Sequence, residues 1–162
     1  MKVSAIISTY NAANLIRDCL EDLLNQTLYQ NGKLEIIIID SGSLENEVKI
    51  IKGFQRSYSA IKYIRTDKRE PLYQAWNRGV EIASGQYITN ANTDDRHHFK
   101  CLERLINKLE EHPDCDVAYG NLYKSSLANE TFEDNDKSKP CYSHMFNPGS
   151  LLLHDFIGAQ PV

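Results

Sequence analysis

Residues 34–40 read Leu-Glu-Ile-Ile-Ile-Ile-Asp (LEIIIID), and this stretch decides the fold class. Four consecutive isoleucines carry β-branched side chains, which favour an extended strand. A strand with one face in water alternates apolar and polar residues, whereas an unbroken apolar run is typical of a strand covered on both faces. Such strands belong to parallel sheets with helices packed on either side, so the stretch predicts an α/β fold.

Strand and helix signals alternate on both sides of this stretch. Short β-rich runs cover residues 2–8, 61–65, 86–89 and 117–123. Helical patterns lie between the runs, at residues 15–24, 44–57, 71–84 and 98–111. Asn11 is expected to cap the first of these helices, and Gly85 to end the third. The succession predicts a single domain with a mainly parallel, five-stranded, doubly wound sheet flanked by helices.

Length and composition narrow the function classes. The chain has 162 residues, enough for one core, and a formal net charge of −4, which argues against general binding of nucleic acid. No apolar run approaches the ~20 residues of a transmembrane helix, and the N-terminus does not resemble a signal peptide. The four cysteines form no CxxC pair, as expected for reduced cysteines. These features predict a cytoplasmic protein, with contact at the inner face of the membrane left open.

Polar residues follow three of the predicted strands directly. The three loops begin with Thr9-Tyr10-Asn11, Asp40-Ser41-Gly42-Ser43 and Asn92-Thr93-Asp94-Asp95. Ligands of open α/β sheets bind beyond the carboxyl ends of the strands, so we expect the loops to converge on one site. Carboxylate and amide oxygens suit Mg²⁺ or Mn²⁺, and the ion could hold a diphosphate. The loops therefore predict a site for a nucleoside diphosphate and a divalent metal.

Two familiar nucleotide sites are disfavoured by the sequence. No GxGxxG follows the first strand and no GxxxxGK[ST] occurs, which argues against a dinucleotide-binding fold and a P-loop. Each polar loop taken singly also fits a purely structural turn or cap. The occurrence of three such loops at strand ends favours the ligand interpretation.

Three segments of the chain read VSAIISTYNAANLIRDCLEDLLNQT, EIIIIDSGS and PLYQAWNRGVEIASGQYITNANTDD. Together they resemble the successive motifs of family 2 glycosyltransferases of GT-A fold, and the resemblance covers roughly residues 2–124. It implies a GT-A, Rossmann-like sheet and an enzyme that uses a nucleotide-diphosphate sugar as donor. The acceptor, a glycan, a lipid or a protein, is not specified.

The resemblance also implies roles for individual residues. The nucleoside would contact Thr9, Tyr10, Asn11 and Asp40, with Ser43 close by, and Tyr73 and Asn77 would shape the donor site. The DxD motif, which binds the metal and the sugar-nucleotide diphosphate, matches Asn92, Thr93 and Asp94. Asp94 and Asn92 are then the expected ligands of Mg²⁺ or Mn²⁺, with Asp95 as an alternative. On an extended segment Asp94 and Asn92 would share one side, and Asp95 would point toward the next helix N-terminus.

The sequence departs from the family pattern at two places. Asn92 stands where the DxD motif has its first Asp, which leaves the site poor in charge. Residues 1–124 are expected to form the nucleotide-sugar-binding core, and residues 125–162 a loop and the start of an apparently truncated acceptor-side region. No counterpart of the downstream acidic motif that supplies the base of inverting members is found, so no catalytic base is assigned.

Three functions remain after the sequence analysis. The leading one is a glycosyltransferase of the kind used in polysaccharide biosynthesis, expected to be inverting and divalent-metal dependent. A non-catalytic nucleotide-sugar-binding module or an inactive fragment is the alternative. A nucleotidyltransferase is disfavoured, because such enzymes need a Gly-rich, basic loop after the first strand and STYNAAN is neither.

Overall fold

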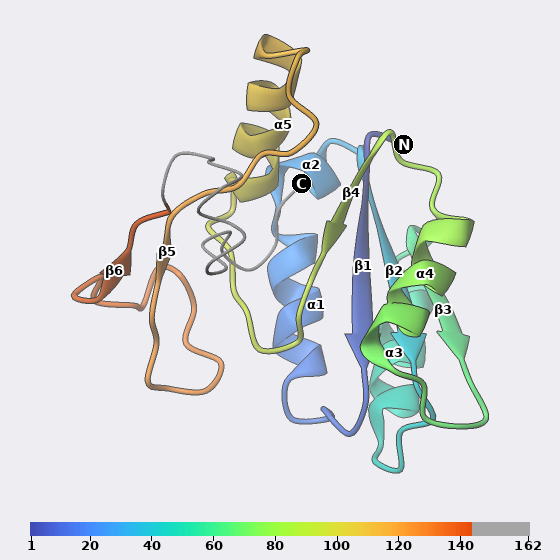
Figure 1. The fold of residues 1–162 in the computed structure, drawn as a ribbon. Helices are drawn as coiled ribbons and strands as arrows, with labels where there is room; N and C mark the ends of the chain where they lie inside the picture. The colour runs from blue at the N-terminus through green and yellow to red at the C-terminus, as the bar shows by residue number, and fades with distance from the viewer. Residues whose placement is uncertain (144–162) are drawn as a thin grey trace.

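The computed structural model describes residues 1–143 and places a four-stranded parallel sheet at its centre, in the order β3-β2-β1-β4 (Figure 1). The elements, in chain order, are β1 (Val3–Thr9), α1 (Ile16–Leu24), α2 (Thr27–Gln30), β2 (Leu34–Asp40), α3 (Glu47–Ser57), β3 (Ile61–Arg65), α4 (Leu72–Ile82), β4 (Tyr87–Asn90), α5 (Cys101–Glu111), β5 (Leu122–Tyr123) and β6 (Pro140–Cys141). All four strands of the sheet run the same way, so their carboxyl ends face one edge.

Strand β2 lies inside the sheet, between β1 and β3, and all seven of its residues are buried. Ile36 and Ile38 point into the larger of two hydrophobic clusters, and Ile37 and Ile39 into the smaller one. The unbroken isoleucine run thus supplies apolar side chains to both faces, as a parallel strand between two layers requires. The prediction of an α/β fold from this stretch is confirmed.

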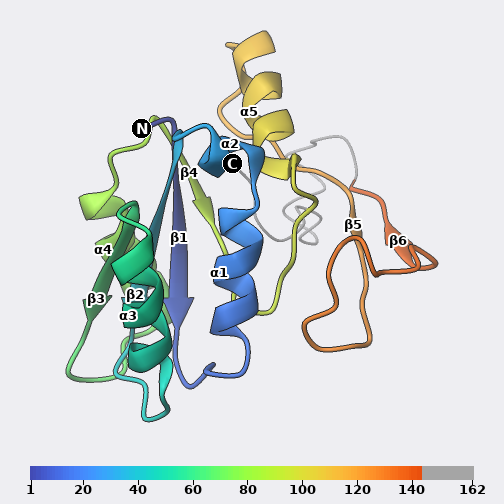
Figure 2. The same cartoon turned by 180° about the vertical axis from the view of Figure 1, so that it is seen from behind.

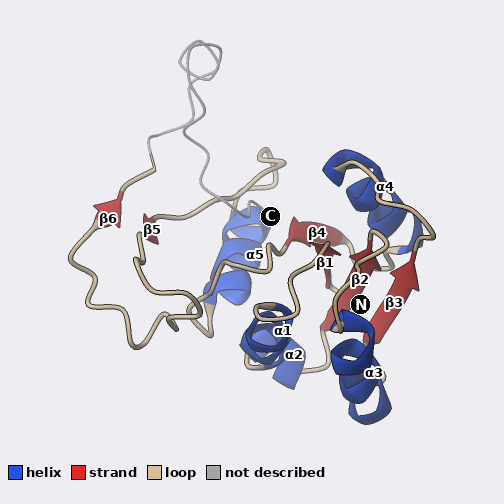
Figure 3. Ribbon diagram, turned by 90° about the horizontal axis from the view of Figure 1, so that it is seen from below, coloured by secondary structure: helices blue, strands red, loops and turns tan. Residues whose placement is uncertain are grey.

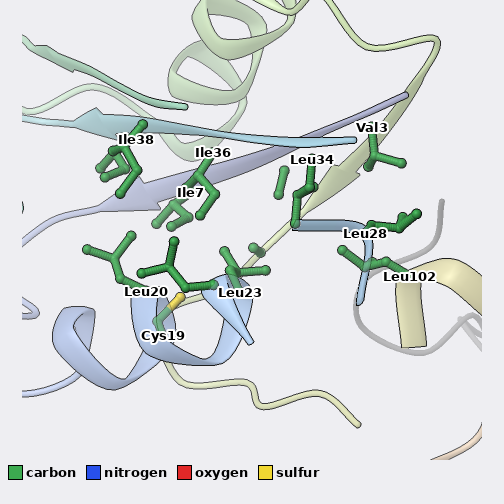
Figure 4. Close-up of a cluster of buried hydrophobic side chains, with 14 of the residues drawn as sticks. Val3, Ile7, Cys19, Leu20, Leu23, Leu28, Leu34, Ile36, Ile38 and Leu102 are labelled. Carbon is green, nitrogen blue, oxygen red and sulfur yellow. The ribbon is translucent and has the colours of Figure 1, made fainter. Parts of the chain in front are cut away.

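Helices cover both faces of the sheet. Seen from below, α1 and α3 lie on one side of the strands and α4 on the other (Figure 3), and the reverse view shows α1 and α3 in front of the sheet (Figure 2). Leu20 and Leu23 of α1 pack toward Ile7, Ile36 and Ile38 (Figure 4). The amphipathic face that the sequence predicts for the first helix is therefore the face that closes the larger cluster.

Two glycines let α4 and its following loop approach the sheet closely. A Cβ at Gly79 would lie 2.4 Å from a side-chain carbon of Ile6, and one at Gly85 would lie 2.6 Å from the main-chain nitrogen of Ser4. Helix α4 ends at Ile82, so the prediction that Gly85 ends the helix is wrong. The residue is small because the chain passes against β1 there.

The predicted fifth strand of the main sheet is also wrong. Within residues 117–123 only Leu122–Tyr123 is extended, and it pairs antiparallel with Pro140–Cys141 in a separate two-stranded ladder (Figure 3). Val117 is 52% exposed, and Gly120 and Asn121 interrupt the apolar run. With little apolar surface to bury, the segment has no reason to join β4 at the edge of the sheet.

The predicted start of an acceptor-side region in residues 144–162 lies outside the described residues. Within residues 1–143, no helix is both long and apolar enough to cross a membrane. All four cysteines lie in the described part and are free thiols, as expected.

Candidate functional site

The carboxylate of Asp40 holds the carboxyl ends of β2 and β3 together. The residue is fully buried, and the main-chain N–H of Ser43 donates to its Oδ1 at 2.8 Å. Its Oδ2 accepts from the Tyr63 hydroxyl at 2.8 Å and from Arg65 Nη1 at 3.1 Å. An Asp at the end of a buried strand is expected to reach into the open site, but the side chain of Asp40 points inward instead. It pairs with Arg65 across the ladder, and donors on β3 draw the carboxylate inward.

Tyr63 remains a proton donor to Asp40. Burial and the hydrogen bond to the carboxylate raise the pKa of Tyr63 to about 12, so the phenol stays neutral at physiological pH. Arg65 Nη2 also donates to the Ser43 carbonyl at 2.6 Å. The loop after β2 is therefore held at Ser43 through both its N–H and its C=O.

The loop after β1 is joined to the loop after β2 through Asn11. Its backbone is left-handed, with φ of 51°, a conformation that Asn tolerates better than most residues. Its side-chain Oδ1 accepts from the Leu44 N–H at 2.7 Å, and its own N–H donates to Ser43 Oγ at 3.1 Å. Helix α1 begins only at Ile16, after Leu15, so Asn11 is not the expected helix cap. It instead ties two site loops together.

Three buried side-chain oxygens in these loops have no hydrogen-bond partner among the described residues: Thr9 Oγ1, Ser41 Oγ and Glu47 Oε2. The other oxygen of Glu47 accepts from the Ala12 N–H at 2.6 Å. A buried polar atom without a partner costs about 1–3 kcal/mol, so most are satisfied in native proteins. They lie at the last residue of β1, directly after β2 and at the first residue of α3, on the side of the sheet where ligands of α/β folds bind.

The other predicted donor-site residues lie around this centre without joining it. The Arg69 guanidinium lies 4.3 Å from the ring centroid of Tyr10, close enough for a cation–π contact. Tyr73 and Asn77 are exposed on the first two turns of α4, and Tyr73 meets Trp76 edge to face. In the described part of the chain no hydrogen bond connects Tyr73 or Asn77 to the loops after β1, β2 or β4.

The loop after β4 contains the predicted metal ligands in an arrangement that differs from the expected one. Asn92 Nδ2 donates to Asp95 Oδ2 at 2.8 Å, so these two side chains face each other, while Asp94 is exposed. Helix α5 begins only at Cys101, and the side chain of Asp95 meets Asn92. Because the loop is not extended, the alternation of a strand does not apply to it.

The donor set suits a hard cation only in part. Among the described residues no group of three His, Cys, Asp or Glu side chains could hold a metal ion. Asp94 supplies a carboxylate that no described hydrogen bond or ion pair engages, and Asn92 supplies an amide oxygen. Oxygen ligands of this kind fit Mg²⁺ or Mn²⁺, which commonly keep several ligands from water or phosphate. The residues therefore fit an ion that shares its coordination with a bound diphosphate.

A cavity of about 800 Å³ opens beside this loop. Residues 94–98 form one wall, Cys101, Arg104 and Leu105 on α5 another, and residues 120–132 with Asn135 the third. Asp94 and Asp95 thus line a space of the size that small-molecule sites have.

Several residues of the site were not singled out from the sequence, among them Tyr63, Arg65, Glu47 and Arg69. The sequence did contain a signal for Tyr63 and Arg65. Residues 61–65 were correctly predicted as a strand, and side chains two residues apart on a strand point to the same face. Nothing local marks Glu47 or Arg69, whose partners lie in other loops. The structure brings Thr9, Asn11, Asp40 and Ser43 together, and holds Asn92, Thr93 and Asp94 in a separate loop.

Known proteins match this chain in sequence and in fold. The family model described as glycosyl transferase family 2 matches residues 4–160. The glycosyltransferase GlyG of Streptococcus pneumoniae is 32% identical over 130 residues, which are 80% of this chain and 42% of GlyG. The chain therefore spans less than half the length of this relative.

Two solved structures show the same fold at low sequence identity. TarS 1–349 of S. aureus in complex with UDP has a TM-score of 0.65 and 24% identity, over 72% of this chain and 34% of that one. The mannosyltransferase PcManGT of Pyrobaculum calidifontis, in complex with GDP-Man and Mn²⁺, has a TM-score of 0.64 and 20% identity, over 78% and 36%.

Proposed function

The chain belongs to glycosyl transferase family 2, and we propose that residues 1–143 form the donor-binding part of an enzyme that transfers a sugar from a nucleoside diphosphate sugar. The fold agrees with the GT-A expectation, since the parallel sheet matches the solved glycosyltransferases. GlyG is longer than this chain, which covers 42% of it. The transfer reaction is therefore proposed for the whole enzyme.

The observation that carries the proposal is the group of unpartnered oxygens on Thr9, Ser41 and Glu47 beside the buried Asp40. A nucleoside offers ring N–H groups and ribose hydroxyls that can donate to such oxygens. The oxygens already lie in loops tied together through Asn11 and Ser43, so little ordering would accompany binding. We place the nucleoside over residues 9–11 and 40–43.

The diphosphate is then placed toward the loop after β4. Asn92 and Asp94 would hold Mg²⁺ or Mn²⁺ there, with Asp95 as the alternative ligand and Thr93 beside the diphosphate. A divalent ion, when bound, would neutralise the charge that develops on the leaving diphosphate. Tyr73 and Asn77 on α4 remain proposed neighbours of the donor.

The reaction proposed is attack by an acceptor hydroxyl on the anomeric carbon of the donor sugar. The carbon–oxygen bond to the diphosphate breaks as the new glycosidic bond forms, and a base takes the proton of the hydroxyl. The acceptor would be a glycan, a lipid or a protein. Inversion at the anomeric carbon follows if the attack is direct, and the anomeric configuration of the product by NMR would test it.

Calorimetric titration of the full chain with UDP, UDP-GlcNAc and GDP-Man, each with Mn²⁺ and with EDTA, tests the proposal. We expect at least one of the three ligands to bind, and to bind more tightly with Mn²⁺. Binding of none would contradict it. Binding without sugar transfer to any acceptor would instead favour a non-catalytic nucleotide-sugar-binding module or an inactive fragment.

A further inference from the structure

Arg96 lies two residues after Asp94 and holds the main chain on both sides of it. Its Nη1 donates to the carbonyl of Thr93 at 2.8 Å and to that of Asp95 at 2.6 Å. Residues 91–100 contain no helix or strand, so no regular hydrogen-bond ladder sets the position of this loop. The guanidinium of Arg96 instead fixes the peptide groups that flank Asp94.

The same guanidinium reaches two other parts of the chain. Nη2 donates to the Leu15 carbonyl, just before α1, at 3.4 Å and to Asn129 Oδ1. Asn129 Nδ2 in turn donates to the Asn14 carbonyl at 3.0 Å. Arg96 and Asn129 therefore join the loop after β4 to the loop after β1, and both to the segment that follows β5.

Asn129 is suited to this bridge by its backbone. Its φ of 61° lies in the left-handed region, which Asn enters more readily than most residues. Residues 123–128 before it are all exposed, and Asn129 is the first to be half-buried. Arg96 and Asn129 line the 800 Å³ cavity together with Asp94, so the bridge joins two walls of this cavity.

We propose that Arg96, oriented by Asn129, is a positioning residue that sets Asp94 for metal and diphosphate, an inference that rests on the proposed function. A purely structural role would be to anchor residues 125–139. The geometry favours positioning, because two of the four bonds of Arg96 go to the peptide groups around Asp94 and a third to the loop that would hold the nucleoside. The distance between the loop after β1 and the loop around Asp94 decides whether one nucleoside diphosphate can contact both, and Arg96 helps to fix that distance.

Substitutions can separate the two roles. Arg96→Lys keeps the charge but replaces a planar fork by a point donor that cannot span acceptors in three segments. Asn129→Gly keeps the left-handed backbone and removes both amide bonds. Asn129→Asp keeps the acceptor for Arg96 and loses only the donor to Asn14. Arg104→Lys is the matched control, since Arg104 is exposed, lines the same cavity and is not part of the bridge.

The measurement is the affinity for UDP, or for GDP if the unaltered chain prefers it, with Mn²⁺ and with EDTA, alongside the melting temperature. We expect Arg96→Lys and Asn129→Gly to lower the gain in affinity from Mn²⁺ by about tenfold, the effect of a lost charge-assisted hydrogen bond. Affinity in EDTA should change by less than about twofold, well below that effect. Asn129→Asp should lose less, and Arg104→Lys should match the unaltered chain.

Two results would overturn the inference. An unchanged gain from Mn²⁺ in both variants, or an equal loss with Mn²⁺ and with EDTA, would show that the bridge is only structural. If Arg96→Lys does not fold, the two Asn129 variants decide by the same criterion. Absence of nucleotide binding in the unaltered chain would overturn the proposed function, and this inference with it.

Discussion

The two ends of β2 carry one buried carboxylate each, and the protein uses them differently. Glu35, near the amino end, is 2% exposed and Asp40, at the carboxyl end, is 0% exposed. Glu35 Oε1 accepts from Ser4 Oγ at 2.5 Å and from the N–H and Oγ of Ser84, and Lys62 Nζ lies 2.8 Å from Oε2. Both carboxylates are thus surrounded by donors.

The difference lies in what surrounds each carboxylate. Among residues 1–143 four buried side-chain atoms have no hydrogen-bond partner, and they belong to Thr9, Ser41, Glu47 and Arg96. Thr9 is the last residue of β1, Ser41 directly follows β2, Glu47 begins α3 and Arg96 lies in the loop after β4, and none of them is a partner of Glu35. At the amino end, the polar side chains around Glu35 are hydrogen-bonded and stabilise the sheet. At the carboxyl end, several buried polar atoms have no partner among residues 1–143. In parallel α/β sheets, ligands bind beyond the carboxyl ends of the strands.

The largest expected effect is the loss of stability on substitution of Glu35. In Glu35→Ala the hydroxyl of Ser4 and the N–H of Ser84 lose a charged acceptor. We expect the free energy of unfolding to fall by about 3 kcal/mol, measured by urea denaturation. Nucleotide affinity of the folded protein should not change. A large loss of affinity with little loss of stability would contradict the division between the two ends.

Acid should remove the same stabilisation. Burial by itself would raise the pKa of Glu35, but hydrogen bonds from Lys62, Ser4 and Ser84 outweigh it and lower the pKa from 4.5 to about 2. The folded state therefore binds fewer protons than the unfolded state in this range. The stabilisation is present above pH 4.5 and is lost as the pH falls through about 2, on the order of 3 kcal/mol in total.

The matched variant for the acid effect is Glu35→Gln, which has no proton to gain. Its free energy of unfolding between pH 5 and pH 2 should therefore fall by less than that of the unaltered chain, by roughly the same 3 kcal/mol. Parallel pH curves for the two proteins would show that Glu35 does not carry the effect.

Asp40 should affect both stability and binding. In Asp40→Asn one carboxylate oxygen becomes an NH₂ group. Ser43, Tyr63 and Arg65 all donate to the carboxylate, so at least one donor then faces another donor and loses its acceptor. We expect the free energy of unfolding to fall by about 1.5–3 kcal/mol and nucleotide affinity to fall at least about tenfold, because the loop after β2 loses its anchor. Calorimetry on the folded variant measures the second effect. Unchanged affinity would remove Asp40 from the donor site.

The smallest and most specific effect concerns Thr9. Thr9→Val keeps the shape and removes a buried hydroxyl oxygen that has no partner, so stability should stay equal or rise by up to about 1 kcal/mol. Nucleotide affinity should nevertheless fall. Ser4→Ala is the matched change at the amino end, where Ser4 Oγ bonds Glu35 and the Gly85 N–H. It should show the opposite pattern, with stability lower and affinity unchanged.

Local pattern was enough for most of the framework. The isoleucines of β2 predict a strand buried on both faces, and the alternating helix and strand signals predict strands β1 to β4 and that they run parallel. Hydrophobic periodicity carries this information because each face of an element must meet an apolar partner. The same reasoning failed at residues 117–123, where Gly120 and Asn121 interrupt the apolar run and the segment does not join the main sheet.

The sequence by itself determined the fold class, the family and the loops from which the site is built. Only the tertiary structure decided how side chains within those loops face one another: Asp40 inward toward Tyr63 and Arg65, Asn92 toward Asp95, and Arg96 toward Asn129. Residue type tells which atoms can donate or accept. Tyr63 lies 23 residues after Asp40, and Asn129 lies 33 residues after Arg96. Local sequence patterns do not predict contacts between residues this far apart in the chain.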